Sequence, residues 1–316
     1  MLQNGLVVAG FGRHVLVETD AGERIICHPR GKKNTAVVGD RIKWLATQDE
    51  GTIEKLEPRR NLFYRQDEIR TKSFAANLDQ ILILIAAEPE FSESQLSRAL
   101  IAAEAEHITP IIALNKSDLT IPFAKAWERL QPYKEMGYNV VSMTLKPKNV
   151  SLASDAADFD IEKIEQQAQL LMSLLQGKTT LVLGPSGAGK STLINAVVPN
   201  ATVFTQEISQ ALNSGKHTTT STTWYWVDEA KTTALIDSPG FQEFGLKHIE
   251  AMHLASYMPD FKVHVPNCKF YNCSHLHEPG CGVLESMKSD SSRRKISLER
   301  YRIYSSLFAE LSEVRY

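Results

Sequence analysis

The sequence has little of three features that would assign it at once to a class of protein. It has only four cysteines in 316 residues, so a disulfide-rich secreted fold is not expected. Its longest apolar run, residues 81–87, is far shorter than the roughly 20 residues that span a bilayer, and Met1 begins no signal sequence. The net charge of −2 gives no global attraction to nucleic acid. We therefore expect a cytoplasmic, monomeric protein with no membrane partner.

Basic residues are nevertheless clustered near both ends of the chain. Each cluster alone is typical of a solvated surface, but any contact with RNA must come from such local patches. The early cluster is Lys32, Lys33, Arg59, Arg60, Arg65, Arg70 and Lys72, and the late one is Arg293, Arg294, Lys295, Arg300 and Arg302.

The chain has two patterns of apolar residues, one after the other. Short β-branched or apolar runs separated by turn residues predict a small barrel of about five strands, at 5–8, 14–18, 24–28, 40–45 and 51–56. Strand-like runs then alternate with helix-length segments. The strands are expected at 80–86, 110–114, 138–143, 179–183, 224–228 and 233–236, and the helices at 93–105, 122–135, 161–175 and 189–196. This alternation predicts an α/β domain whose parallel sheet has helices on both faces.

Two further segments complete the organisation of the chain. Residues 198–223 are polar and lack periodicity, which predicts a loop. From about residue 248 onward, three cysteines lie near two histidines, and residues 296–311 have apolar positions at helical spacing.

A phosphate-binding loop is predicted where an apolar strand precedes a helix. The match to GxxxxGK[ST] consists of Gly184, Pro185, Ser186, Gly187, Ala188, Gly189, Lys190, Ser191 and Thr192. Glycines let backbone N–H groups turn toward phosphate oxygens, and the helix N-terminus favours the negative charge. Lys190 is expected to bridge the β- and γ-phosphates as a catalytic residue, and Ser191 to bind Mg²⁺.

A guanine-reading element is predicted at the end of another strand. Asn115, Lys116, Ser117 and Asp118 form NKxD at a strand's carboxyl end, where open α/β sheets bind ligands. The Asp118 carboxylate can accept hydrogen bonds from the ring N–H and the amine of guanine, a pair that adenine cannot donate. Asn115 would bind the other edge of the purine, and the Lys116 stem would pack along the ring.

A third element, DSPG at residues 237–240, follows the strand at 233–236. Asp237 is expected to hold Mg²⁺ through water, and the Gly240 N–H to contact the γ-phosphate. The order of the three elements is unusual, because NKxD precedes the phosphate loop and DSPG comes last. A cyclic shift of a standard GTPase domain explains this order, since domain termini commonly lie close together. The shift joins DSPG directly to the C-terminal region, so nucleotide state could set the orientation of that region.

The cysteine-rich segment predicts a metal site. Cys268, Cys273 and Cys281 with one histidine supply a ligand set suited to tetrahedral Zn²⁺, and four protein ligands leave no position for water. The predicted zinc site is therefore structural. On spacing alone, both His275 and His277 are possible fourth ligands. Cys27 is expected to be a small buried apolar residue.

At this point the whole chain resembles the RsgA (YjeQ/YloQ) family of circularly permuted GTPases of small ribosomal subunit biogenesis. The motifs that carry the resemblance are NKSD, GPSGAGKST, GKHTTT at 215–220, DSPG and the Cys/His cluster. It implies an OB-fold barrel at 1–70, the permuted GTPase at 71–245, and a helical zinc domain at 246–316. It also implies binding to the 30S subunit and its 16S rRNA, GTP hydrolysis that the subunit stimulates, and a role in late maturation. The family pattern Cys-x-His-x-x-Glu-x-x-Cys selects His275, with Glu278 and Cys281 in register.

The catalytic group is less clear from the residues than the binding elements. Phe241 stands where Ras-like proteins have a water-orienting glutamine, and Gln242 is shifted by one residue. The resemblance implies that His217 positions the water, a role that a loop histidine can perform. Thr218, Thr219 or Thr220 is expected to complete the Mg²⁺ shell, with Thr218 or Thr219 favoured.

The leading hypothesis is a ribosome-dependent GTPase whose barrel and tail grip 16S rRNA. On the barrel, the Lys32–Lys33 loop with Phe63, Tyr64 and Arg65 suits an OB-fold contact with RNA. Two alternatives remain at this stage: a GTP-gated RNA-binding adaptor with incidental hydrolysis, and a GTPase that acts on another RNA.

Overall fold

Five short strands close into a barrel at the N-terminus. The computed structural model describes residues 2–11, 13–31, 35–47, 50–66, 71–145, 156–199, 201, 222–238, 241, 244–288 and 296–313. The barrel strands are β1 (Gln3–Phe11), β2 (His14–Thr19), β3 (Arg24–Pro29), β4 (Arg41–Ala46) and β5 (Gly51–Leu56). They are hydrogen-bonded in the order β1-β2-β3-β5-β4, and β4 pairs again with β1, which closes the barrel. The five predicted strands are all confirmed.

The interior of the barrel is a small apolar core of its own. Its members are Val7, Val15, Val17, Cys27, Ile42, Trp44 and Ile53. Gly51 is required beside the Trp44 ring, because a Cβ there would lie 2.4 Å from Cys27 Sγ and 2.7 Å from Trp44 Cε3. Cys27 is fully buried, as expected for a small apolar residue.

The central sheet has the predicted parallel strands and one exception. Its order is β10 (Asn139–Ser142), β9 (Thr109–Asn115), β8 (Gln80–Ala86), β11 (Thr179–Leu183), β13 (Ala234–Asp237) and β12 (Thr223–Trp226). Only β12 runs antiparallel to its neighbour β13. A short turn explains this direction, because the Asp228 carboxylate accepts hydrogen bonds from the amides of Thr232 and Thr233 and reverses the chain.

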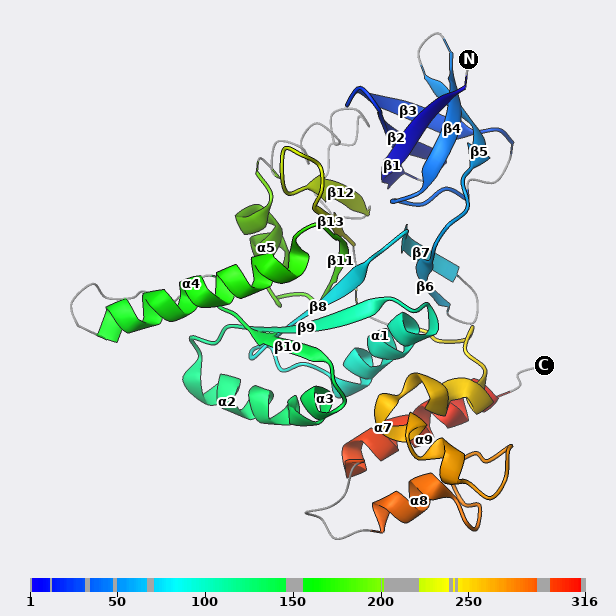
Figure 1. Cartoon of the computed structure of the whole chain (residues 1–316), viewed down its shortest axis with the longest axis vertical. Coiled ribbons are helices and arrows are strands. Elements are labelled where there is room, and N and C mark those ends of the chain that lie inside the picture. Colours follow the sequence, from blue (N-terminus) through cyan, green and yellow to red (C-terminus); the bar gives the residue numbers. More distant parts are fainter. Residues whose placement is uncertain are drawn as a thin grey trace.

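Helices flank this sheet on both sides, as predicted (Figure 1). α4 (Ala156–Leu175) and α5 (Lys190–Val197) lie on one side. α1 (Glu93–Ala105), α2 (Thr120–Arg129) and α3 (Gln131–Glu135) lie on the other. The single helix predicted at 122–135 is wrong in one respect, since it breaks at Leu130. Pro132 lies in the first turn of the next helix, where a proline is tolerated, whereas its ring could not continue the preceding helix.

A hairpin between the barrel and the sheet was not predicted from the sequence. It consists of β6 (Leu62–Gln66) and β7 (Thr71–Ala76), so the domain boundary predicted at residues 70–71 falls between its strands. Phe63 and Phe74 of this hairpin pack against Phe244, with ring centroids 5.5 Å and 5.9 Å from it. Phe63 is fully buried, so its predicted part in an RNA-binding surface is wrong. Tyr64 is half-buried and packs on the His248 ring.

The barrel is joined to the central sheet by strand pairing and by one buried carboxylate. β1 pairs with β12 at Ala9 and Thr223, which makes the barrel and the sheet one continuous set of strands. Beside this junction, the buried Glu18 carboxylate on β2 accepts hydrogen bonds from Trp226 Nε1 at 2.9 Å and Lys231 Nζ at 2.6 Å.

Replacing Glu18 by alanine is expected to lower the free energy of unfolding by about 1–3 kcal/mol, because two donors lose their buried acceptor. Urea denaturation followed by tryptophan fluorescence measures this change. Asp20→Ala is the matched control, since Asp20 is exposed just beyond the same strand. Equal losses for the two variants would contradict a role for Glu18 in the junction.

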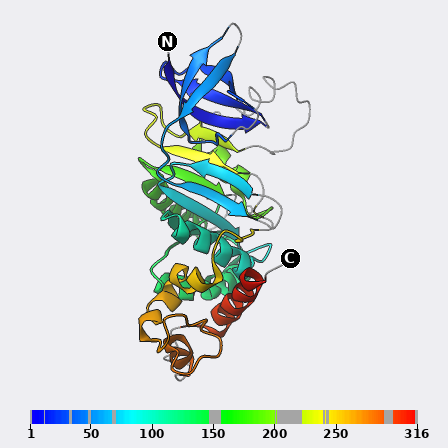
Figure 2. The ribbon, with the colours of Figure 1, turned by 90° about the vertical axis from the view of Figure 1, so that its right-hand side faces the viewer.

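The C-terminal part is helical and packs on α1. Its elements are η1 (Ala251–Tyr257), α7 (Pro259–Lys262), η2 (Val265–Asn267), α8 (Gly282–Met287) and α9 (Leu298–Ser312). α9 confirms the helix expected at 296–311, and it buries Ile303, Tyr304 and Leu307. The barrel, the sheet and these helices follow one another along the long axis of the molecule (Figures 1 and 2). No helix in the described ranges has the length and apolar character needed to cross a membrane.

Two arginines fasten the C-terminal part to the sheet domain. Arg300 of α9 is buried, and it donates to both oxygens of Asp260 at 2.9 Å and to Ser97 Oγ of α1 at 2.7 Å. Arg98, the next residue of α1, pairs with Glu310 of α9 and donates to the Phe244 carbonyl at 3.2 Å. The C-terminal part is therefore held by α1 as well as by the chain that follows DSPG.

Candidate functional site

The predicted phosphate loop connects β11 to α5 at the carboxyl edge of the sheet. Gly184 lies against β8, where a Cβ would come within 2.4 Å of the Leu84 carbonyl oxygen. Gly187 and Gly189 have φ angles of +80° and +105°, a conformation that only glycine adopts without strain. Within the loop Gly184 and Ala188 are buried, Pro185, Gly189, Lys190 and Thr192 are half-buried, and Ser186, Gly187 and Ser191 are exposed. The sequence thus forms a turn that only its three glycines allow.

Lys190 and Asp237 meet at this edge from two different segments. Lys190 is the first residue of α5, and its Nζ forms an ion pair with Oδ1 of Asp237, the last residue of β13. Asp237 is 6 % exposed, and burial raises the pKa of its carboxyl while Lys190 opposes that rise. Each charge therefore stabilises the other at the carboxyl edge of the sheet.

The predicted guanine-reading element lies directly against the predicted phosphate loop. Asn115 ends β9, and its Nδ2 donates to the Ala188 carbonyl at 2.8 Å. Its Oδ1 accepts from the amides of Lys116 at 2.8 Å and Leu145 at 3.2 Å. A Cβ on Gly189 would lie 2.4 Å from Asn115 Nδ2, so the two motifs touch. Two elements that are 66 or more residues apart in sequence lie side by side.

The other residues of this element adopt an open geometry. Lys116 has a φ of +68°, and its Nζ donates to the Glu88 carbonyl oxygen. Asp118 is exposed at the surface of the loop, where a ligand can reach its carboxylate.

A third segment of this site, residues 143–145 after β10, was not predicted from the sequence. The Met143 carbonyl accepts from Ser117 N at 3.1 Å, and Thr144 Oγ1 lies 2.5 Å from Ser117 Oγ. The strand β10 is the feature that could have indicated this segment. It lies parallel to β9, and neighbouring parallel strands end at the same edge of a sheet. This segment is the wall of the site beside Ser117.

Some predicted residues lie outside the part of the chain that the structure describes. They are His217, Thr218, Thr219, Thr220, Gly240 and Gln242. Phe241 is described and is buried, with its ring 6.3 Å from that of Phe244. The residue at the Ras glutamine position is thus packed in the apolar core.

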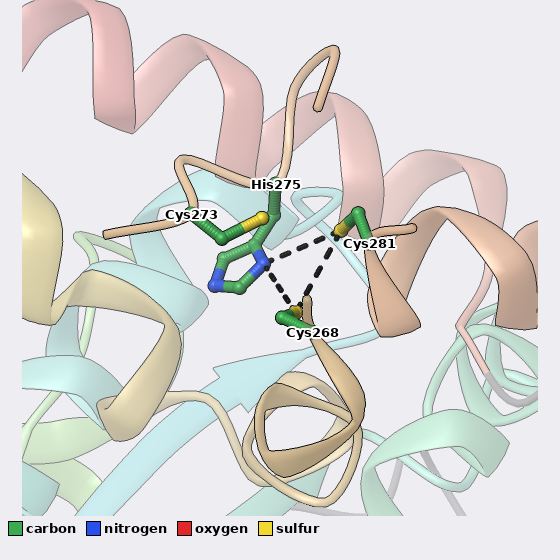
Figure 3. Close-up of side chains that lie close together, drawn as sticks. All are labelled: Cys268, Cys273, His275 and Cys281. Atoms are coloured by element: carbon green, nitrogen blue, oxygen red, sulfur yellow. Dashed lines mark hydrogen bonds between the residues drawn. The ribbon is translucent and has the colours of Figure 1, made fainter. Parts of the chain in front are cut away.

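The Cys/His cluster brings four candidate ligand atoms together (Figure 3). The three thiol sulfurs and one nitrogen of His275 all lie within 4.8 Å of one another. His275 Nδ1 is 3.5 Å from Cys268 Sγ and 3.4 Å from Cys281 Sγ, and the latter two sulfurs are 4.0 Å apart. Thiolate and imidazole ligands around a tetrahedral ion lie about 3.5–3.8 Å apart, so these residues fit one such ion. His277 is exposed and is not part of the cluster.

The residues around the cluster hold it in a shape ready for a cation. The amides of Gly282 and Leu284 donate to Cys268 Sγ and Cys281 Sγ. Burial raises the pKa of the Cys273 thiol to about 12, so binding of a cation must displace its proton.

The Glu278 carboxylate holds the loop at residues 274–277 through hydrogen bonds to its amides. The carboxylate accepts from Ser274 N at 2.8 Å and from the amides of Leu276 and His277 at 3.3 Å. Burial alone would raise the pKa of Glu278, but the hydrogen bonds from Ser274 and the loop amides lower it to about 2. From α9, the Tyr301 and Tyr304 hydroxyls donate to the carbonyls of His275 and Ser274.

The strand order and the joined motifs define a circularly permuted P-loop GTPase with a Cys/His cluster that fits one metal ion. The family model of the RsgA GTPase matches residues 56–247, which is more than half of the chain. The chain belongs to the RsgA GTPase family and is a GTP hydrolase.

Relatives and solved structures agree with this assignment. The chain is 67% identical to the small ribosomal subunit biogenesis GTPase RsgA of Variovorax paradoxus, over 100% of this chain and 95% of that protein. It is 47% identical to the protein of the same name from Paraburkholderia phytofirmans, over 98% and 94%. It is also similar to the crystal structure of YjeQ from Thermotoga maritima, with 27% identity, a TM-score of 0.70 and full coverage of both chains. The structure of YloQ, described as a circularly permuted GTPase, matches with 25% identity and a TM-score of 0.68, over 100% of this chain and 98% of that one.

Proposed function

We propose that this chain is a cytoplasmic, monomeric GTPase that binds the 30S ribosomal subunit, assists its late maturation, and hydrolyses GTP faster when bound to it. The observation that carries the proposal is the 67% identity over the whole chain with a protein named for small ribosomal subunit biogenesis. The barrel at one end and the metal-centred helices at the other are the surfaces proposed to contact 16S rRNA. Arg65 and Lys72, which face each other across the β6–β7 hairpin, support such a contact beside the barrel.

The residues proposed to bind GTP surround the carboxyl edge of the sheet. Residues 184–192 would hold the phosphates, and Asn115, Lys116, Ser117 and Asp118 would hold the base. Ser191 and Asp237 would hold Mg²⁺ together with Thr218 or Thr219, and Gly240 would contact the γ-phosphate. Mg²⁺ supplies neutralisation of the phosphate charge when it is bound. The Lys190–Asp237 pair supports these roles, because it sets a cation and an anion side by side where both are needed.

The metal of the Cys/His cluster is proposed to be one structural Zn²⁺. Cys268, Cys273, His275 and Cys281 supply three thiolates and one imidazole, the ligands that zinc prefers. All four coordination positions are then filled by protein, so the ion would stabilise the fold rather than take part in hydrolysis.

GTP turnover with and without purified 30S subunits tests the proposed function. We expect the subunit to raise kcat, and we expect His217→Ala to keep nucleotide affinity while lowering the stimulated rate about 10²-fold, the usual worth of a positioned proton acceptor. Subunits of the 50S type serve as the control. If 30S subunits bind the GTP-loaded protein without raising turnover, the chain is a GTP-gated adaptor instead. If His217→Ala leaves the stimulated rate intact, the role of His217 is wrong.

Replacing Asp118 by asparagine is expected to weaken GTP binding about 10²-fold, because an amide cannot accept both hydrogen bonds from guanine. Displacement of a fluorescently labelled nucleotide by GTP and by ATP measures the affinity of the site for each. Glu128→Gln on α2 is the control, since it also neutralises an exposed carboxylate nearby in sequence. Equal use of GTP and ATP by the unaltered protein would contradict the base-reading role.

A further inference from the structure

The four residues of the base-reading loop, 115–118, are held unequally. Asn115 is fixed by three hydrogen bonds to the phosphate loop and to neighbouring amides. Asp118 is exposed, and no hydrogen bond to its carboxylate occurs among the described residues. Since a carboxylate selects guanine only when its oxygens face both donors of the base, something must fix its direction. Ser117, directly before Asp118, is held at both its amide and its hydroxyl.

Ser117 lies in a directed chain of hydrogen bonds. Its hydroxyl donates to Gln167 Oε1 at 3.4 Å, so the Thr144 hydroxyl, 2.5 Å away, donates to it. Gln167 Nε2 in turn donates to Ser142 Oγ at 3.0 Å. The chain therefore runs from Thr144 through Ser117 and Gln167 to Ser142. Hydrogen bonds in such a series polarise and strengthen one another.

Gln167 is the member of this chain that links two parts of the domain. It projects from α4, the helix that leads into β11 and from there into the phosphate loop. Its side-chain amide accepts from Ser117 through the oxygen and donates to Ser142 through the nitrogen. A carboxylate of similar size could not donate to Ser142, and a hydrocarbon could neither donate to Ser142 nor accept from Ser117.

We propose that Gln167 is a positioning residue for guanine selectivity, which fixes Ser117 from α4 and thereby aims the Asp118 carboxylate at the purine. This inference rests on the base-reading role proposed for residues 115–118. Gln167 does not touch the nucleotide in this scheme, and it acts only through Ser117.

The test compares the affinities of GDP and IDP for the full chain by titration calorimetry. The hypoxanthine of IDP lacks the exocyclic amine, so the ratio of the two dissociation constants reports how well Asp118 meets that amine. Gln167→Ala is expected to reduce this ratio about three- to tenfold, the effect of one misaligned hydrogen bond. Gln166→Ala is the matched control, because Gln166 is exposed on the same helix and bonds only to Glu162 within it. It should leave the ratio unchanged.

A purely structural role for Gln167 gives a different result. If Gln167→Ala weakens GDP and IDP equally, or leaves both affinities intact, the proposal is overturned. Should that variant fail to fold, Ser142→Ala removes the far end of the series, and it is expected to reduce the ratio about twofold; an unchanged ratio there also overturns the proposal. An unaltered protein that binds IDP as well as GDP would overturn the base-reading role itself, a failure visible without any variant.

Discussion

Replacing Lys190 by alanine is expected to lower GTP turnover about 10³-fold, the effect of removing a preorganised cation from a phosphoryl-transfer site. Lys190 begins α5 with its ammonium group beside Asp237, and both charges are largely shielded from water. An arriving phosphate would take the ammonium and free the carboxylate for the metal. Without Lys190, the phosphate would meet the buried Asp237 charge with no cation between them.

The measurement is steady-state release of phosphate, with nucleotide affinity determined separately. Lys178→Ala is the control, since it removes an exposed lysine just before β11, the strand that enters the phosphate loop. A loss confined to affinity, with kcat unchanged, would mean that Lys190 binds the ground state and the transition state equally. Turnover within about threefold of the control would contradict its catalytic role.

Replacing Cys281 by serine is expected to remove the bound metal and to destabilise the C-terminal helices by about 5 kcal/mol or more. Cys281 is 1 % exposed, and its sulfur also accepts from Leu284 N at the start of α8. The loss of one thiolate would therefore affect both the metal cluster and a helix cap. Metal content by atomic absorption and the rate of proteolysis within residues 246–288 measure the two effects.

Cys27→Ala provides the matched control for this change. Cys27 is buried in the barrel, far from the cluster in sequence, so its loss should cost about 1 kcal/mol of packing and leave the metal content unchanged. A Cys281→Ser protein that retains about one ion per chain would contradict the assignment of that ligand.

The sequence predicted best those features that depend on neighbouring residues. The barrel strands were bounded by turn residues, and α1 begins just after its N-cap Ser92, whose hydroxyl accepts from Gln95 N. The Cys/His cluster was also predictable, because its four candidate ligands lie within a short segment. Spacing alone did not separate His275 from His277; the family pattern selected His275, and the structure buries that side chain while leaving His277 exposed.

Features that depend on distant residues were missed. The β6–β7 hairpin is held by Phe244, which is about 170 residues further along the chain than Phe74, so no local pattern indicates it. The contact of Asn115 with Ala188 and the wall formed by residues 143–145 depend in the same way on how strands are ordered in the sheet. Phe63 was assigned wrongly, because an aromatic residue next to basic ones in sequence is compatible both with stacking on a base and with packing in a core.

The two junctions between the parts of this molecule also determine the order in which it can be completed during synthesis. All five barrel strands lie within residues 3–56, so the barrel can form early. Its pairing with β12 must wait until residue 223 has been made, and the partners of Ser97 and Arg98 on α9 come only with residues 300 and 310. Contacts between such distant residues form slowly. In a nascent chain the barrel can therefore fold long before its position relative to the central sheet is fixed. The contacts of α9 with α1 form last, because α9 is the last helix to be synthesised.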